Sequence, residues 1–124
     1  MPTPDERVLT IVRGTWASPG DQQQVLDRLA LYGVEPHERE VPRVQLAILK
    51  LSEGRLDRLA DLVSAAKRDY RDVLMWAEYP EEGQALWALR PDLTPEERAR
   101  LEELRRRDRA QLQAWLEQVK GRPC

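Results

Sequence analysis

Residues 44–51 read Val-Gln-Leu-Ala-Ile-Leu-Lys-Leu, and six of these eight side chains are apolar. Placed on a helix, the apolar positions cover most of the circumference rather than one stripe, which is typical of a buried helix. Pro42 suits the first turn of such a helix, and Gly54 suits its end. We therefore predict a central helix whose Val44–Leu51 segment forms the middle of the core.

Downstream of Gly54, apolar residues recur in alternating steps of three and four. They are Leu56, Leu59, Val63, Ala66, Tyr70, Val73 and Ala77. The spacing keeps them on one helical face, and no Gly or Pro interrupts it, so it favours a continuous helix from about Arg55 to Tyr79. The alternative is a break at residues 67–69, where Lys67 and Arg68 would suit a helix C-terminus and Asp69 would cap a new helix.

Upstream, two start signals precede the central segment. Thr3-Pro4-Asp5-Glu6 predicts a helix capped by Thr3 that runs to about Thr15, with a strand as the alternative because residues 8–12 are rich in β-branched side chains. Ser18-Pro19-Gly20-Asp21 predicts a second helix that ends at Gly33. Residues 35–42 form a charged linker with a proline near each end.

The last third of the chain begins with Pro80-Glu81-Glu82-Gly83, which we expect to stop the preceding helix and lead into a short turn over residues 84–89. Thr94-Pro95-Glu96-Glu97 is a capping box with Pro at the first helical position, and it predicts a helix from Pro95 to about Lys120. The expected protein is all-α. It is one domain over residues 1–124, a small bundle of four or five helices in which a compact body (1–93) carries a long C-terminal helix (94–120), packed on it or extended.

The composition argues against several classes of protein. The chain has 124 residues, of which 34% are charged and 41% hydrophobic, and its longest apolar run is the five residues Val73–Ala77. Such a run is too short for a membrane span, so we expect a cytoplasmic protein. Twenty Lys and Arg against 22 Asp and Glu give a net charge of −2, which argues against an affinity dominated by phosphate contacts. One His, His37, and one Cys exclude a Cys/His zinc site and an internal disulfide, and no cofactor or metal is expected.

The C-terminal helix carries a cluster of arginines that suggests nucleic-acid binding. The candidate basic face is Arg98, Arg105, Arg106, Arg107 and Arg109. Acids precede arginines by four residues at Glu102/Arg106 and Glu103/Arg107, the better orientation for pairing along a helix. The pattern therefore favours a solvated face that largely neutralises itself.

Asp108 breaks the apolar stripe of the same helix. The stripe consists of Leu101, Leu104, Leu112, Trp115 and Val119. Two interpretations remain open: the first half of the helix projects beyond the domain and Asp108 stays in water, or the helix packs against a second copy and Asp108 meets an arginine that fixes the register.

Two further groups of side chains are candidates for a site. Asp69, Arg71, Asp72 and Glu78 form a polar cluster in which carboxylates suit acid–base chemistry, although neighbouring cations favour ion pairs at the surface. The second group consists of Met75, Trp76, Tyr79, Trp87 and Trp115, residue types enriched at the centres of interfaces. This second group is either covered by the protein's own last helix or is a surface for a partner.

Residues 43–54 (RVQLAILKLSEG), 66–74 (AKRDYRDVL) and 77–80 (AEYP) together resemble a segment of short bacterial proteins of unassigned function. The resemblance implies a bacterial, cytosolic setting and brings no activity with it. We expect a non-enzymatic protein–protein interaction or adaptor module, which binds a protein partner or forms a homodimer, without membrane or metal. The alternatives are a nucleic-acid-associated regulatory protein using the basic face and, least favoured, a carboxylate enzyme.

Overall fold

A computed structural model describes the backbone of residues 5–88 and 92–120, and throughout these ranges the regular structure is helical. The helices are α1 (Glu6–Thr15), α2 (Pro19–Leu29), α3 (Val41–Ser52), α4 (Leu56–Arg68), α5 (Tyr70–Glu78), α6 (Pro80–Ala88) and α7 (Pro95–Lys120). The prediction of an all-α protein with a long C-terminal helix is confirmed. The described part holds seven helices rather than four or five, for two reasons given below.

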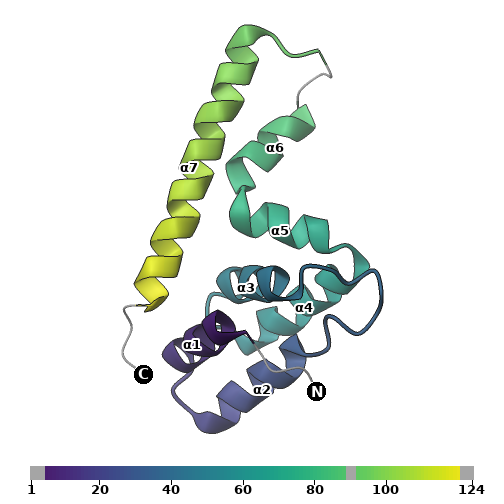
Figure 1. Cartoon of the computed structure of the whole chain (residues 1–124), viewed down its shortest axis with the longest axis vertical. Coiled ribbons are helices and arrows are strands. Elements are labelled where there is room, and N and C mark those ends of the chain that lie inside the picture. The colour runs from purple at the N-terminus through teal and green to yellow at the C-terminus, as the bar shows by residue number, and fades with distance from the viewer. Residues whose placement is uncertain (1–4, 89–91, 121–124) are drawn as a thin grey trace.

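Helix α3 lies at the centre of the fold, as the sequence predicts. Val44 and Ile48 have no exposed surface, and Ala47 and Leu49 are each 4% exposed. Helices α1, α4 and α5 pack against α3 on different sides, which is why its apolar residues surround the helix rather than forming one stripe. In Figure 1, α1 to α5 form the body of the molecule around this helix.

The prediction of one helix from Arg55 to Tyr79 is wrong, because the helix is interrupted at Asp69. The Asp69 backbone is extended, with φ −158° and ψ 103°, and its side chain accepts a hydrogen bond from the backbone N–H of Arg71. The break has a physical reason. A helix of 12 residues such as α3 is about 18 Å long, so a straight helix of about 37 Å would leave half of its apolar face uncovered. Bending at Asp69 lets both α4 and α5 pack on α3.

The prediction of a short turn at residues 84–89 is also wrong. Helix α6 starts at Pro80 and continues through Gly83 to Ala88, so Pro80 both ends α5 and begins α6. Gly83 is buried where α6 contacts α5. A Cβ atom at this position would overlap the side chain of Met75 and lie 2.7 Å from its Sδ. The glycine that suggested a turn therefore allows α5 and α6 to approach each other closely.

At the N-terminal end, α1 is a helix and the strand alternative is wrong. The expected cap Thr3 lies outside the described residues, and the cap of α1 is Asp5, whose carboxylate accepts from the Arg7 backbone N–H at 2.9 Å. Ser18 caps α2 as predicted. Helix α2 ends at Leu29, earlier than predicted, and Gly33 adopts its positive φ of 104° inside the loop that follows.

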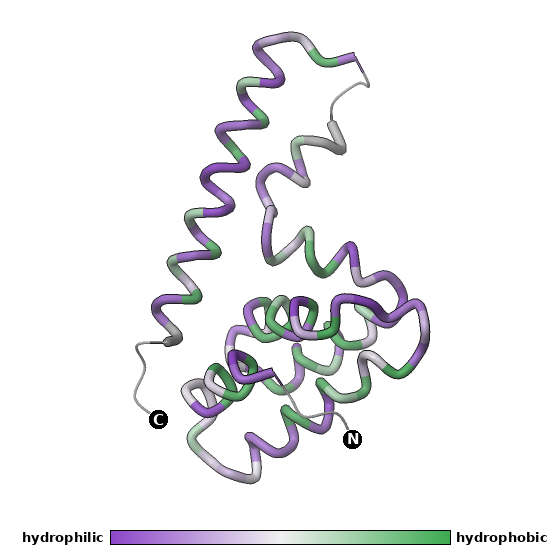
Figure 2. The backbone as a smooth tube through the Cα atoms, viewed as in Figure 1, coloured by the Kyte–Doolittle hydropathy of each residue, from purple (hydrophilic) through white to green (hydrophobic). Residues whose placement is uncertain are grey.

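Helix α7 begins at the predicted capping box, where the Thr94 hydroxyl accepts from the Glu97 N–H and the Glu97 carboxylate accepts from the Thr94 N–H. It packs along α6 and reaches back to α1. In Figure 1, α6 and α7 lie side by side above the body, and Figure 2 shows that most of α7 is hydrophilic. No helix in the described ranges is long and apolar enough to cross a membrane.

Candidate functional site

The start of α6 is held by a carboxylate from α7. Asp108 is 1% exposed, and its two oxygens accept hydrogen bonds from the backbone N–H groups of Glu81, at 3.1 Å, and Glu82, at 2.9 Å. The first N–H groups of a helix have no partner within the helix, and its N-terminus favours negative charge. Asp108 therefore caps α6 from another helix. Neither interpretation from the sequence, a solvated Asp108 or a contact with a second copy, describes this structure.

Three more polar contacts join α7 to the same corner. Arg105 Nε donates to Glu82 Oε2 at 2.7 Å, and Arg107 pairs with Glu81 at 3.2 Å. Gln111 donates to the backbone carbonyl of Ala77 at 3.2 Å. We call residues 105, 107, 108 and 111 the α7 clamp. Its partners all lie within residues 77–82, at the junction of α5 and α6.

A hollow of about 250 Å³ opens beside the clamp. It is lined by Arg43, Glu78, Tyr79, Glu82, Arg105, Asp108, Arg109 and Leu112. The structure thus brings together candidates that the sequence analysis had placed in three separate groups: Glu78 from the polar cluster, Tyr79 from the aromatic group, and Arg105 and Arg109 from the basic face. The charges in the hollow are close to balanced, so it offers no strong field for an anion or a cation.

Arg43 reaches this hollow from the first turn of α3. Its Nε donates to Glu78 Oε2 at 2.8 Å, and its Nη1 donates to Glu40 at 2.6 Å. The hydrogen bond to Glu78 raises the pKa of Arg43 above its ordinary value, against the opposing effect of burial, so the guanidinium stays charged. Arg43 and Glu78 join the start of α3 to the end of α5. Glu78 is therefore engaged in an ion pair that joins two helices.

Lys50 of α3 contributes a further charge near the clamp. Burial lowers the pKa of its ammonium group, while the nearby carboxylate of Asp108 opposes that effect. A buried cation is costly unless an anion lies near it. Asp108 therefore caps α6 and also favours the charged form of Lys50.

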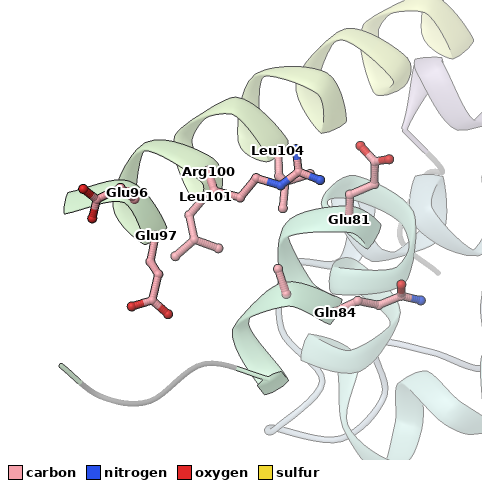
Figure 3. Close-up of a pocket in the computed structure, with 8 residues that line it drawn as sticks. Glu81, Gln84, Glu96, Glu97, Arg100, Leu101 and Leu104 are labelled. Atoms are coloured by element: carbon pink, nitrogen blue, oxygen red, sulfur yellow. The ribbon is translucent and has the colours of Figure 1, made fainter. Parts of the chain in front are cut away.

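A second hollow, of about 470 Å³, lies further along the contact between α6 and α7. Leu101 and Leu104 project into it from α7, and Figure 3 shows Glu81 and Gln84 on the α6 side. Glu96, Glu97 and Arg100 border it near the start of α7. Leu101 and Leu104 are only 8% and 6% exposed, so most of each side chain is already covered by the protein itself.

The basic face is partly neutralised by carboxylates. Three of its five arginines have carboxylate partners, because Arg105 and Arg107 belong to the clamp and Arg106 pairs with Glu103 at 3.1 Å. Such pairing reduces the positive charge that would displace the counterions of a nucleic acid.

The other members of the polar cluster lie apart from Glu78. Asp69 accepts from Arg71 Nη2 at 2.9 Å, and this hydrogen bond lowers the pKa of Asp69, which keeps the carboxylate charged. Asp72 is exposed on α5. The arrangement suits the cap of α5 and an ion pair at the surface.

The aromatic candidates separate into different environments. Trp115 is partly buried against the core, and Met75 packs at Gly83. Trp76 is 44% exposed on α5, although both neighbouring turns of that helix carry buried residues. The side chain of Trp87 lies outside the described residues. Of this group, Trp76 is the side chain that the structure presents to solvent.

The loop between α2 and α3, residues 30–40, is held in place by Glu38, which the sequence did not reveal. We call it the braced loop. Glu38 is 5% exposed, and its Oε1 accepts from the backbone N–H groups of Gly33, Val34 and Glu35 at 2.8, 3.0 and 3.3 Å. Its Oε2 accepts from Lys67 Nζ at 2.9 Å. Burial alone would raise the pKa of Glu38, but the hydrogen bonds from Lys67 and the backbone outweigh it and lower the pKa to about 2.

The braced loop displays two aliphatic side chains. Leu31 is 54% exposed and Val34 is 70% exposed. The carbonyl of Leu31 accepts from Lys67 Nζ at 2.7 Å, and the Tyr32 hydroxyl donates to the Arg39 carbonyl. Burial, together with the charge of Glu38, raises the pKa of Tyr32 to about 12, so its hydroxyl stays a donor. The only early signal was a glutamate inside a linker flanked by prolines, and nothing there distinguished Glu38 from its charged neighbours.

Among the described residues, no group of three or more His, Cys, Asp or Glu side chains is placed to hold a metal ion. His37 lies in the braced loop, with Nε2 at 3.1 Å from the Lys67 carbonyl. Comparison of the chain with protein-family models, curated proteins and solved structures gives no match. The resemblance to short bacterial proteins therefore stays a prediction.

Proposed function

We propose that this protein is a non-enzymatic binding module for another protein. The observation that carries the proposal is the exposure of large apolar side chains on rigid elements. Trp76 projects from α5, a helix fixed by three buried residues, and Leu31 and Val34 project from the loop braced by Glu38. Exposed apolar side chains on fixed elements suit a binding surface, because little conformational entropy is lost when a partner covers them.

Trp76 is the residue from which we expect the largest contribution. Tryptophan is the residue type most enriched among those that dominate binding energy at interfaces. On α5 it follows Asp72 by four residues, so these two exposed side chains lie along one side of the helix. A partner that covers Trp76 would contact an acidic group at its edge.

A capture experiment with the full-length chain as bait tests the proposal. The baits are the wild type, Trp76→Ser and, as a matched exposed control on another helix, Gln24→Ser. Support requires a protein retained by the wild type and the control but lost with Trp76→Ser, followed by a direct titration in which the purified partner binds Trp76→Ser at least about tenfold more weakly. If no retained protein is lost with Trp76→Ser, the proposal is wrong. Circular dichroism checks that each bait is folded.

A further inference from the structure

Helix α7 is packed less completely than the helices of the body. Hollows of about 470, 250 and 390 Å³, open to solvent, border α7. The third is lined by residues of α1 and α7, Ile11 and Leu116 among them. A helix bordered by such hollows makes fewer dispersion contacts with its neighbours than a helix enclosed on all sides.

The burial pattern agrees with this. Of the 24 residues of α7 whose side chains are described, Leu101, Leu104 and Asp108 are the buried ones. By contrast, half of the 12 residues of α3 are buried. Leu112, Trp115 and Leu116 of α7 are partly buried and complete its inner face. The body therefore gains little apolar burial from α7 for a helix of this length.

The α7 clamp sets the position of α7. Asp108 caps α6, Gln111 bonds to the Ala77 carbonyl, and Arg105 pairs with Glu82. These bonds are directional, and they set the register of one helix against residues 77–82. Any helix with the same residues in the same spacing satisfies them equally, whether or not it belongs to the same chain.

We infer that the face beneath α7, formed by α1, α5 and α6, is a docking groove for an amphipathic helix that carries a carboxylate. In an assembly, the helix that occupies this groove is α7 of a second copy. The second copy is the occupant that the contacts specify, because α7 already matches the groove at the clamp and along its apolar stripe. The exposed residues of α7 are mostly charged, with Gln and Ala between them, so the exchange exposes no large apolar side chain (Figure 2). This inference rests on the proposed function, since it names a partner of the module, but it uses a surface other than Trp76.

A peptide in trans tests the groove without altering the protein. The probe is a synthetic fluorescent peptide of residues 92–120, titrated with the full-length wild-type protein and followed by fluorescence anisotropy. We expect saturable binding, weakened in proportion to the fraction of molecules whose own α7 is released. A peptide with Asp108→Asn should bind about tenfold more weakly, because it offers a neutral acceptor to the start of α6. A peptide with Arg98→Gln, changed at an exposed position, should bind as the unaltered peptide does.

Light scattering tests the occupant. After incubation of the full-length protein at high concentration just below its unfolding midpoint, we expect a dimer that persists on dilution and that is lost when excess peptide is present. Absence of saturable peptide binding, equal binding of the Asp108→Asn peptide, or a monomer at every concentration would each overturn the inference. Full-length Trp76→Ser should bind the peptide like the wild type, so failure of the Trp76 surface and failure of the groove give different results.

Discussion

Replacing Asp108 tests the central contact of the fold. Asp108→Ala removes both acceptors from the start of α6 and leaves the N–H of Glu82, a buried donor, without a partner. An unsatisfied buried donor costs roughly 1–3 kcal/mol, and loss of a helix cap costs about 0.5–2 kcal/mol. The two effects overlap, because the cap is made of these same bonds. We therefore expect the free energy of unfolding to fall by about 3 kcal/mol.

Two companion variants distinguish the cap from other roles. Asp108→Asn keeps one acceptor oxygen and loses the charge, so we expect a loss of about 1–2 kcal/mol. Asp108→Leu completes the apolar stripe of α7. If Asp108 were only a charge placed on an apolar seam, leucine would stabilise the protein, whereas the observed hydrogen bonds predict that it destabilises the protein about as much as alanine does.

Urea unfolding followed by far-ultraviolet circular dichroism measures these differences, and Glu102→Ala, an exposed acid of the same helix, is the matched control. For a chain of this size the loss expected for Asp108→Ala lowers the melting temperature by roughly 10 °C. The reasoning is refuted if Asp108→Ala lies within about 0.5 kcal/mol of the control, the range of ordinary surface substitutions, or if Asp108→Leu is more stable than the wild type.

Three other predictions follow from contacts described above. The pKa of Glu38 is about 2, against 4.5 for an ordinary glutamate, so its charge stabilises the fold above about pH 4.5 and this stability is lost as the pH falls toward 2. Glu38→Gln should therefore cost about 2 kcal/mol near neutral pH and progressively less in acid, which urea titrations at several pH values measure; a constant difference would contradict the role of the charge. Gly83→Ala should destabilise by about 1–3 kcal/mol despite the higher helix propensity of alanine, and Met75→Ala should relieve part of that loss in a double-mutant cycle of melting temperatures; additive effects would show that the two residues do not meet. In electrophoretic shifts at low salt we expect no binding of duplex DNA, because three of the six arginines of α7 pair with carboxylates and the whole chain has a net charge of −2, and a shift that weakens steeply with added salt would argue for the basic face.

Local signals were sufficient for the parts of the fold that depend on neighbouring residues. The buried α3 follows from the density of apolar residues at 44–51, and the start of α7 follows from Thr94 and Glu97, which bond to each other in the structure as the capping box requires. Both signals involve residues at most a few positions apart, so their physical effect is complete within the segment itself.

The break at Asp69 shows where such reasoning fails. The apolar stripe keeps its phase from Leu56 to Ala77, and this regularity favoured one helix. The stripe records which side chains are buried, but not the length of the surface that buries them. That surface is the 12-residue α3, and its size becomes known only when the helices are assembled. Asp69 had the right chemistry for a cap, and tertiary packing decided between the two readings.

At the candidate site too, the contact between the α7 clamp and residues 77–82 depends on tertiary packing that local signals do not contain. Pro80 with Glu81 and Glu82 is as good a signal for the start of a helix as for the end of one, but the preceding Tyr79 has no side chain that accepts a hydrogen bond well at a cap. A buried helix start without its own cap needs an acceptor from elsewhere, and Asp108 is that acceptor.

Placing Asp108 beside Glu81 and Glu82 gathers three carboxylates at one point, which would repel one another in a partly buried corner. Arg105 and Arg107, which precede Asp108 by three residues and one residue, pair with Glu82 and Glu81 and offset that repulsion. Part of the arginine cluster that suggested nucleic-acid binding is therefore the counter-charge of a helix cap. A sequence shows the arginines and the acids, but it does not show that residues 26 and 27 positions apart share one helix terminus. That pairing makes Arg105 and Arg107 part of a clamp.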